Sequence, residues 1–209
     1  GFERDSSCGF EAITHILPLL PPCKWRNKIF DMMVQAKALI DDTYSPSNSQ
    51  CGGHITIGVK GLSGQELAEK LAKYMGIVLA IYRKRLSNSF CFNNPFVATP
   101  SNHDTGIGYE MDRYSAMLIK SDTIELRLPN RITSVRQMML RYELMYLLVD
   151  TAINRNTMSS NKFFEMVKPI IEKMYVGEPK KVEFLMWLAP LFQDSINRNK
   201  YNEVTAYYS

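Results

Sequence analysis

Three short segments that alternate between apolar and polar residues place the tightest limit on the fold of this chain. They cover residues 9–16, 53–59 and 123–128. Because successive side chains of a β-strand point to opposite faces of its sheet, each segment predicts a strand with one apolar and one polar face. If the three strands pair in one sheet, its polar face collects four ionisable side chains: Glu11, His54, Glu125 and Arg127.

Apolar residues at helical spacing predict helices between and after these strands. The expected helices cover residues 25–40, 63–82, 161–175 and 180–196, with a further long helix that begins at Ser134. Ser63 opens a capping-box pattern, which marks the start of the second helix. Residues 83–112 are loop-like, and residues 113–128 fit a hairpin that turns at Lys120 and Ser121. This order favours an α+β fold, in which helices cover one face of an antiparallel sheet.

The bulk composition argues against several function classes. The chain has 209 residues with 25 basic and 21 acidic side chains, so its net charge of +4 is mild. No basic stripe with interleaved aromatic residues is present, and we expect no nucleic-acid partner. No apolar stretch approaches the roughly 20 residues of a membrane span, so we expect no membrane partner. The four cysteines are scattered without a C-x-x-C pair, which favours reduced thiols and a cytoplasmic location.

Three motifs lie in order along the chain: Asp5-Ser6-Ser7 followed by Gly9-Phe10-Glu11, then CGGHITIG at residues 51–58, then TIELR at residues 123–127. Together they resemble the motifs of the amidoligase family. The family's pattern is a D-x-S…G-x-E strand, a C-G-x-H-x-H-x-G strand and an I-E-x-R strand. The resemblance covers about residues 4–153. It implies a curved antiparallel sheet of the glutamine-synthetase catalytic type, with helices on one face. The chain would then divide into a catalytic domain over residues 1–153 and a helical C-terminal extension over residues 154–209.

The resemblance also implies an activity, namely an ATP- and Mg²⁺-dependent ligase that joins a carboxylate to an amine. ATP would phosphorylate the carboxylate, and the amine would then attack the acyl phosphate. Two or more divalent cations would neutralise the triphosphate and the transferring phosphoryl group. The implied partners are small-molecule or peptide carboxylates and amines.

The positions that match the family's motifs carry the roles that the resemblance implies. Mg²⁺ prefers oxygen ligands, so Glu11 and Glu125 are expected to bind metal, together with His54. The expected catalytic residues are Glu11, Glu125 and Arg127. The residues expected to hold the nucleotide and its phosphates are Asp5, Thr56, Arg85 (or equally Arg83), Arg113 and Arg127.

Two features depart from the family's pattern. The family has an acidic first strand before the D-x-S motif, whereas this chain begins at Gly1 without a methionine. We therefore expect a processed or truncated chain, or an acidic strand supplied by another chain. Thr56 also occupies the place of a second histidine. These departures leave an alternative open, in which a non-catalytic relative of this fold acts as a structural or protein-interaction subunit.

Each candidate site residue also has a purely structural interpretation. Glu125 and Arg127, two positions apart on one strand, could form ordinary surface ion pairs. His54 could be a hydrogen-bonded structural histidine, and Glu11 could lie on a solvated face. The sequence alone does not choose between these interpretations and a functional site.

Overall fold

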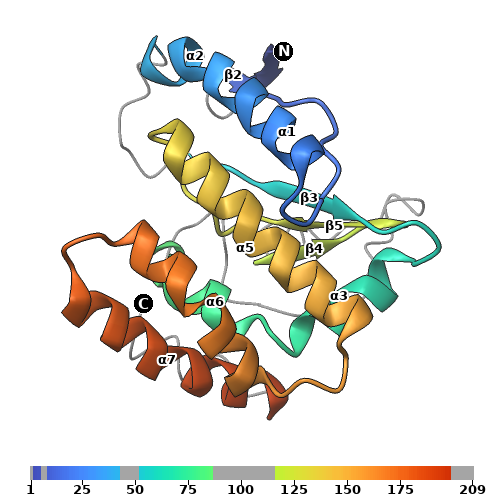
Figure 1. Ribbon diagram of the computed structural model, residues 1–209. Helices are drawn as coiled ribbons and strands as arrows, with labels where there is room; N and C mark the ends of the chain where they lie inside the picture. Colours follow the sequence, from blue (N-terminus) through green and yellow to red (C-terminus); the bar gives the residue numbers. More distant parts are fainter. Residues whose placement is uncertain (1, 6–8, 43–51, 87–115, 199–209) are drawn as a thin grey trace.

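The computed structural model describes residues 2–5, 9–42, 52–86 and 116–198 of the chain (Figure 1). Its strands are β1 (Phe2–Asp5), β2 (Gly9–Ala12), β3 (Ile55–Gly58), β4 (Met117–Ile119) and β5 (Thr123–Leu126). Its helices are α1 (Lys24–Gln35), α2 (Lys37–Asp42), α3 (Gly64–Ala72), α4 (Gly76–Tyr82), the 3-10 turn η1 (Arg83–Arg85), α5 (Val135–Asn154), α6 (Ser160–Met174) and α7 (Pro179–Asn197). The expected α+β class is confirmed.

A three-stranded antiparallel sheet carries the candidate site, with the strand order β3-β5-β4. Its register pairs Thr56 of β3 and Leu118 of β4 with the same residue of β5, Glu125. β4 and β5 form the expected hairpin. Two of the three alternating segments are therefore neighbours in one sheet, and β5, the segment that carries Glu125, is its central strand.

The prediction that all three segments share one sheet is wrong for the first of them. β2 pairs with β1 in a separate hairpin, where Glu11 lies opposite Glu3. The strand ends at Ala12 instead of Ile16, and the Ile16 side chain is fully exposed (101%). Pairing with β1 satisfies part of the strand's backbone hydrogen bonding, and alternation alone does not specify which strand is the neighbour.

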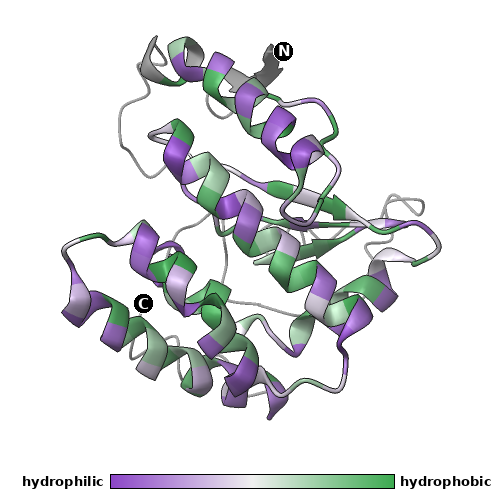
Figure 2. Cartoon of the chain, in the orientation of Figure 1, coloured by the Kyte–Doolittle hydropathy of each residue, from purple (hydrophilic) through white to green (hydrophobic). Residues whose placement is uncertain are grey.

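One hydrophobic core joins the sheet to the helices. Its apolar side chains come from β3, β4 and β5 and from α3 to α7, so it continues across residue 153 into the C-terminal helices. Every residue of α4 is buried, and α4 packs closely against α7. Figure 2 shows that hydrophobic and hydrophilic residues alternate along α5, a helix that contributes to this core. The catalytic region and the helical extension expected from the sequence therefore share one core.

The long helix α5 separates α1 from the C-terminal pair of α6 and α7 (Figure 1). In a smaller apolar cluster that includes Ile29, Met33 and Tyr142, α1 packs against α5. The Tyr142 hydroxyl donates to the carbonyl oxygen of Pro18 at 2.5 Å and accepts from the amide of Leu20 at 2.8 Å. This one side chain therefore also holds the segment that leads into α1.

The helix expected over residues 63–82 is broken into α3 and α4. Gly76 lies at the break because a Cβ atom at this position would clash with the carbonyl oxygen of Ala189 in α7. The Gln193 side chain bonds to the interrupted backbone: its Oε1 accepts from the amide of Gly76 at 3.0 Å. Its Nε2 donates to the carbonyl oxygen of Ala72 at 2.9 Å. Local periodicity predicts one helix here, and packing against α7 divides it.

Candidate functional site

A buried carboxylate lies on the sheet face that points away from the core. Ile124 and Leu126 of β5 are fully buried in the core, and Glu125 between them points to the opposite face. Glu125 is only 5% exposed, and among the residues whose exposure the structure describes it is the one buried acidic residue. Burial of a carboxylate is unfavourable unless partners satisfy it, so the groups around Glu125 define the candidate site.

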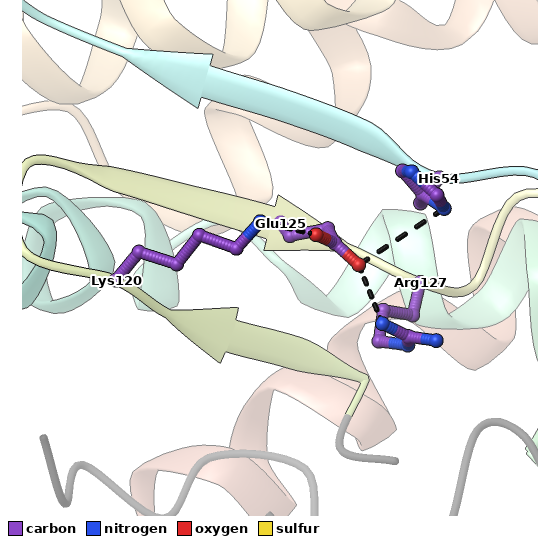
Figure 3. A network of polar contacts seen from close by, with 4 residues as sticks. All are labelled: His54, Lys120, Glu125 and Arg127. Atoms are coloured by element: carbon purple, nitrogen blue, oxygen red, sulfur yellow. Dashed lines mark hydrogen bonds and ion pairs between the residues drawn. The ribbon is translucent and has the colours of Figure 1, made fainter. Parts of the chain in front are cut away.

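Two cations and a histidine surround this carboxylate (Figure 3). Lys120 Nζ donates to Oε2 at 2.6 Å, and Arg127 Nη1 donates to Oε1 at 2.6 Å. His54 Nδ1 lies 4.0 Å from Oε1. Each carboxylate oxygen therefore has a charged partner. The structure brings together three residues that the sequence singled out, namely His54, Glu125 and Arg127.

The positions of the β3 residues at the site depend on their pairing with β5 and on one extra residue on the β5 side. Thr56 lies directly across from Glu125 and is exposed on the same face of the sheet. Before β3, the amide of Gly53 donates to the carbonyl oxygen of Pro129 at 2.9 Å. Gly52 pairs with Asn130, and Ile55 pairs with Leu126. Between these two pairs, three residues on the β5 side (127–129) face two residues on the β3 side (53–54). Such a bulge bends a strand and redirects side chains, and here it falls beside His54.

The electrostatics of the cluster keep Glu125 ionised. Burial alone would raise the pKa of this carboxyl. Burial is the largest single effect, but the hydrogen bond from Lys120 and the charges of His54, Arg127 and Lys120 together outweigh it, so the pKa of Glu125 lies below its ordinary value. The ion pairs therefore compensate for burial, and the carboxylate remains an acceptor for its neighbours.

Lys120 is the member of the cluster that the sequence patterns do not identify, because they place it only in the turn of the hairpin. Leu118 pairs with Glu125, so Lys120, two positions further along, lies on the same face as a diagonal neighbour. Diagonal neighbours on antiparallel strands are within reach of long side chains. The register of the predicted hairpin, combined with this rule, is the signal that could have identified Lys120.

The start of α3 sets the position of the turn that carries Lys120. The amide of Gly64 donates to the carbonyl oxygen of Ser121 at 2.9 Å. A Cβ atom at Gly64 would clash with the carbonyl oxygens of Lys120 and Thr123, so only glycine allows this close approach. The capping box of Ser63 and Glu66, expected from the sequence, is present and fixes the same helix end.

Arg85 lies close to the β3 side of the site. It ends η1, and its Nη2 atom would be 2.5 Å from a Cβ atom at Gly52, two residues before His54. The glycine therefore leaves room for the guanidinium group. This placement is compatible with the expected role of Arg85 as a phosphate ligand. Arg83, the alternative, instead stacks on the Phe184 ring of α7.

The remaining candidates are not part of the described cluster. Glu11 belongs to the separate β1–β2 hairpin, and Asp5 ends β1 opposite Gly9. Arg113 lies outside the described residues.

The described side chains fit an oxyanion better than a pair of metal ions. Mg²⁺ prefers six oxygen ligands in near-octahedral geometry, and Glu125 is the only carboxylate in the cluster described above. Both of its oxygens are engaged by Lys120 and Arg127. No group of three or more His, Cys, Asp or Glu residues suited to a metal occurs within the described ranges. Metal binding at Glu125 would require ligands from elsewhere, such as Glu11, and rearrangement of at least one ion pair.

Comparison with protein-family models, with curated protein sequences and with solved structures found no match to this chain. Within the part of the chain that the structure describes, no helix is both long enough and apolar enough to cross a membrane.

Proposed function

We propose that this chain is the catalytic region of an ATP- and Mg²⁺-dependent amidoligase, which joins a carboxylate to an amine through an acyl phosphate. The observation that carries the proposal is the convergence of His54, Glu125 and Arg127 on one sheet face, with Thr56 across from Glu125. These residues come from two of the three motifs that resemble the amidoligase family. A sheet of the glutamine-synthetase catalytic type and a cytoplasmic location belong to the same proposal.

The proposed reaction has two steps. A carboxylate oxygen of the substrate attacks the γ-phosphorus of ATP, the bond from that phosphorus to the β-phosphate oxygen breaks, and ADP leaves. The amine nitrogen then attacks the acyl carbon and loses a proton, and inorganic phosphate leaves.

The chain's own residues would orient and stabilise the anionic groups in this reaction. Arg127 would hold a phosphate oxygen through its planar guanidinium group, a geometry suited to oxyanions. Arg85 would add a second guanidinium near the start of β3. The Thr56 hydroxyl can donate to an oxyanion on the same face. Glu125 would hold Arg127 in a fixed orientation, as it does through the 2.6 Å hydrogen bond.

Calorimetry with Mg-ATP tests the proposal. We expect wild-type protein to bind Mg-ATP, and we expect Glu125→Gln and His54→Ala each to abolish detectable binding while the far-UV circular dichroism stays unchanged. Glu183→Gln, at an exposed glutamate of α7, is the matched control and should bind as wild type does. Unchanged nucleotide affinity in both site variants would contradict the assignment of the site.

A second function is favoured by one specific observation, the completeness of the ion pairs around Glu125. A non-catalytic relative could retain Lys120, Glu125 and Arg127 to stabilise the β4–β5 hairpin in a structural or interaction subunit. In that case wild-type protein would bind no Mg-ATP, and Glu125→Gln would lower stability alone. Calorimetry of wild-type protein with Mg-ATP therefore separates the two functions, because Glu125→Gln lowers stability in either case.

A further inference from the structure

The contact between Lys120 and Glu125 has a consequence for the ligand of the site. We propose that Lys120 acts as a resident cation, which occupies the Glu125 oxygen that a divalent ion would need and makes the cluster bind a phosphate-type oxyanion without metal. The 2.6 Å contact from Nζ to Oε2 and the 2.6 Å contact from Arg127 to Oε1 carry this inference. It rests on the site of the proposed function but not on ligase chemistry.

The balance of charge favours an anion at this position. Two cations face one carboxylate, so the cluster has a net positive charge even when His54 is neutral. A divalent cation would meet two like charges within a few ångströms, whereas an oxyanion would meet two opposite ones. The Arg85 guanidinium, near Gly52, adds positive charge on the β3 side.

The distribution of exposure also favours an anion. The side chain of Glu125 is 6% exposed, whereas those of Lys120 and Arg127 are 40% and 26% exposed. The negative group is thus the covered one, and the positive groups are those that solvent reaches. A ligand that arrives from solvent therefore meets the cations before it meets the carboxylate.

The donors on this side suit phosphate oxygens. The Lys120 ammonium has three N–H donors, and its hydrogen bond to Oε2 of Glu125 uses one of them. Thr56, exposed on the same face, offers a hydroxyl donor. Charge-assisted hydrogen bonds from ammonium and guanidinium groups are among the strongest that phosphate oxygens accept. Lys120 would therefore hold Glu125 with one donor and the ligand with another.

Titration of pyrophosphate into metal-free protein tests the inference. In excess EDTA, we expect calorimetric binding of pyrophosphate to wild-type protein, with chemical-shift changes at the side-chain signals of Lys120 and His54. Lys120→Met should weaken this binding about tenfold or more, the effect of one lost charge-assisted hydrogen bond. The same variant should bind Mn²⁺, used as a paramagnetic metal probe, more tightly than wild type does, because Oε2 becomes accessible.

Two further variants keep the test decisive. Lys120→Arg retains the positive charge and should restore most of the pyrophosphate affinity, which distinguishes loss of charge from loss of fold. Lys180→Met, at an exposed lysine of α7, is the matched control and should bind as wild type does. Binding of pyrophosphate to wild-type protein only when Mg²⁺ is added, or equal affinity in Lys120→Met, would overturn the inference.

The outcomes also separate this inference from the proposed function. Metal-free pyrophosphate binding without Mg-ATP binding would support the oxyanion site and contradict the ligase. Mg-ATP binding without metal-free pyrophosphate binding would support the ligase and contradict the role of Lys120. Inorganic phosphate and ATP, titrated separately in EDTA, show whether the oxyanion belongs to a free phosphate or to a nucleotide.

Discussion

Single residues decide the energetics of the site, and Glu125 is the most important of them. A buried carboxylate without partners would take up a proton or destabilise the fold. Here Lys120 and Arg127 bond to its two oxygens, so the ionised form is the stable one. Removal of the negative charge would leave two cations facing each other on one sheet face.

Acid should reduce stability through Glu125. Its pKa in the folded protein lies below the ordinary value of 4.5, so its ionised form contributes stability that is fully present above that pH. This contribution is lost as the pH falls through the folded-state pKa. We expect Glu125→Gln to lower the free energy of unfolding by about 2 kcal/mol at pH 7. The loss should shrink as the pH falls below 4.5, because wild type then progressively loses this contribution.

Urea unfolding followed by circular dichroism, at neutral pH and at about pH 3.5, measures this effect. The exposed Glu183, replaced by Gln, serves as the control for a simple change in net charge. An equal loss of stability at both pH values in Glu125→Gln would show that the carboxylate is not held by its ion pairs.

At the scale of elements, the β4–β5 hairpin and the start of α3 form one unit. The helix begins against the turn, with the amide of Gly64 bonded to the carbonyl oxygen of Ser121. This turn also positions Lys120 next to Glu125. A displacement of the turn by a larger residue at Gly64 should therefore affect the site, although Gly64 is not a site residue.

Gly64→Ala should displace the turn. Its added methyl group would meet the carbonyl oxygens of Lys120 and Thr123, which are backbone atoms and cannot rotate away. We expect a loss of about 1–3 kcal/mol in unfolding free energy, typical of overpacking, and weaker pyrophosphate binding. Ser63→Ala is the matched control: it removes the cap for about 1 kcal/mol without a clash. Equal ligand affinity in the two variants would argue against the link between α3 and Lys120.

At the scale of the whole molecule, α7 joins the C-terminal helices to the part that carries the sheet. Gln193 is 2% exposed and bonds to both ends of the break between α3 and α4. The apolar core continues from β5 through α4 to α7. A continuous core of this kind favours cooperative unfolding of both regions together.

Gln193→Leu should destabilise the entire chain. The amide of Gly76 and the carbonyl of Ala72 would lose their side-chain partner, at a cost of about 2–4 kcal/mol in unfolding free energy. Helical circular dichroism and the side-chain signal of His54 should disappear in one urea transition at a lower midpoint. Gln35→Leu, at an exposed position on α1, should leave the midpoint nearly unchanged. Two separate transitions would mean that the C-terminal helices fold as an independent unit.

Local patterns were sufficient to predict much of the site. Alternation along β5 places Glu125 and Arg127 on one face because the strand has a period of two residues. The same period predicts that Thr56 and His54 share a face of their own segment. The prediction failed for Glu11, because alternation says nothing about which strand will be the neighbour. Lys120 was missed because its role depends on the register across a turn.

The sequence by itself determined the α+β class, the capped start of α3 at Ser63 and the polar face of β5, since each depends on contacts between residues close in the chain. Only the tertiary structure decided that β2 pairs with β1, that residues 63–82 form two helices, and that Lys120 meets Glu125. These features depend on contacts over long separations, such as that between Gly76 and Gln193. Their free energies depend on which surfaces meet in three dimensions, and no local period encodes that choice.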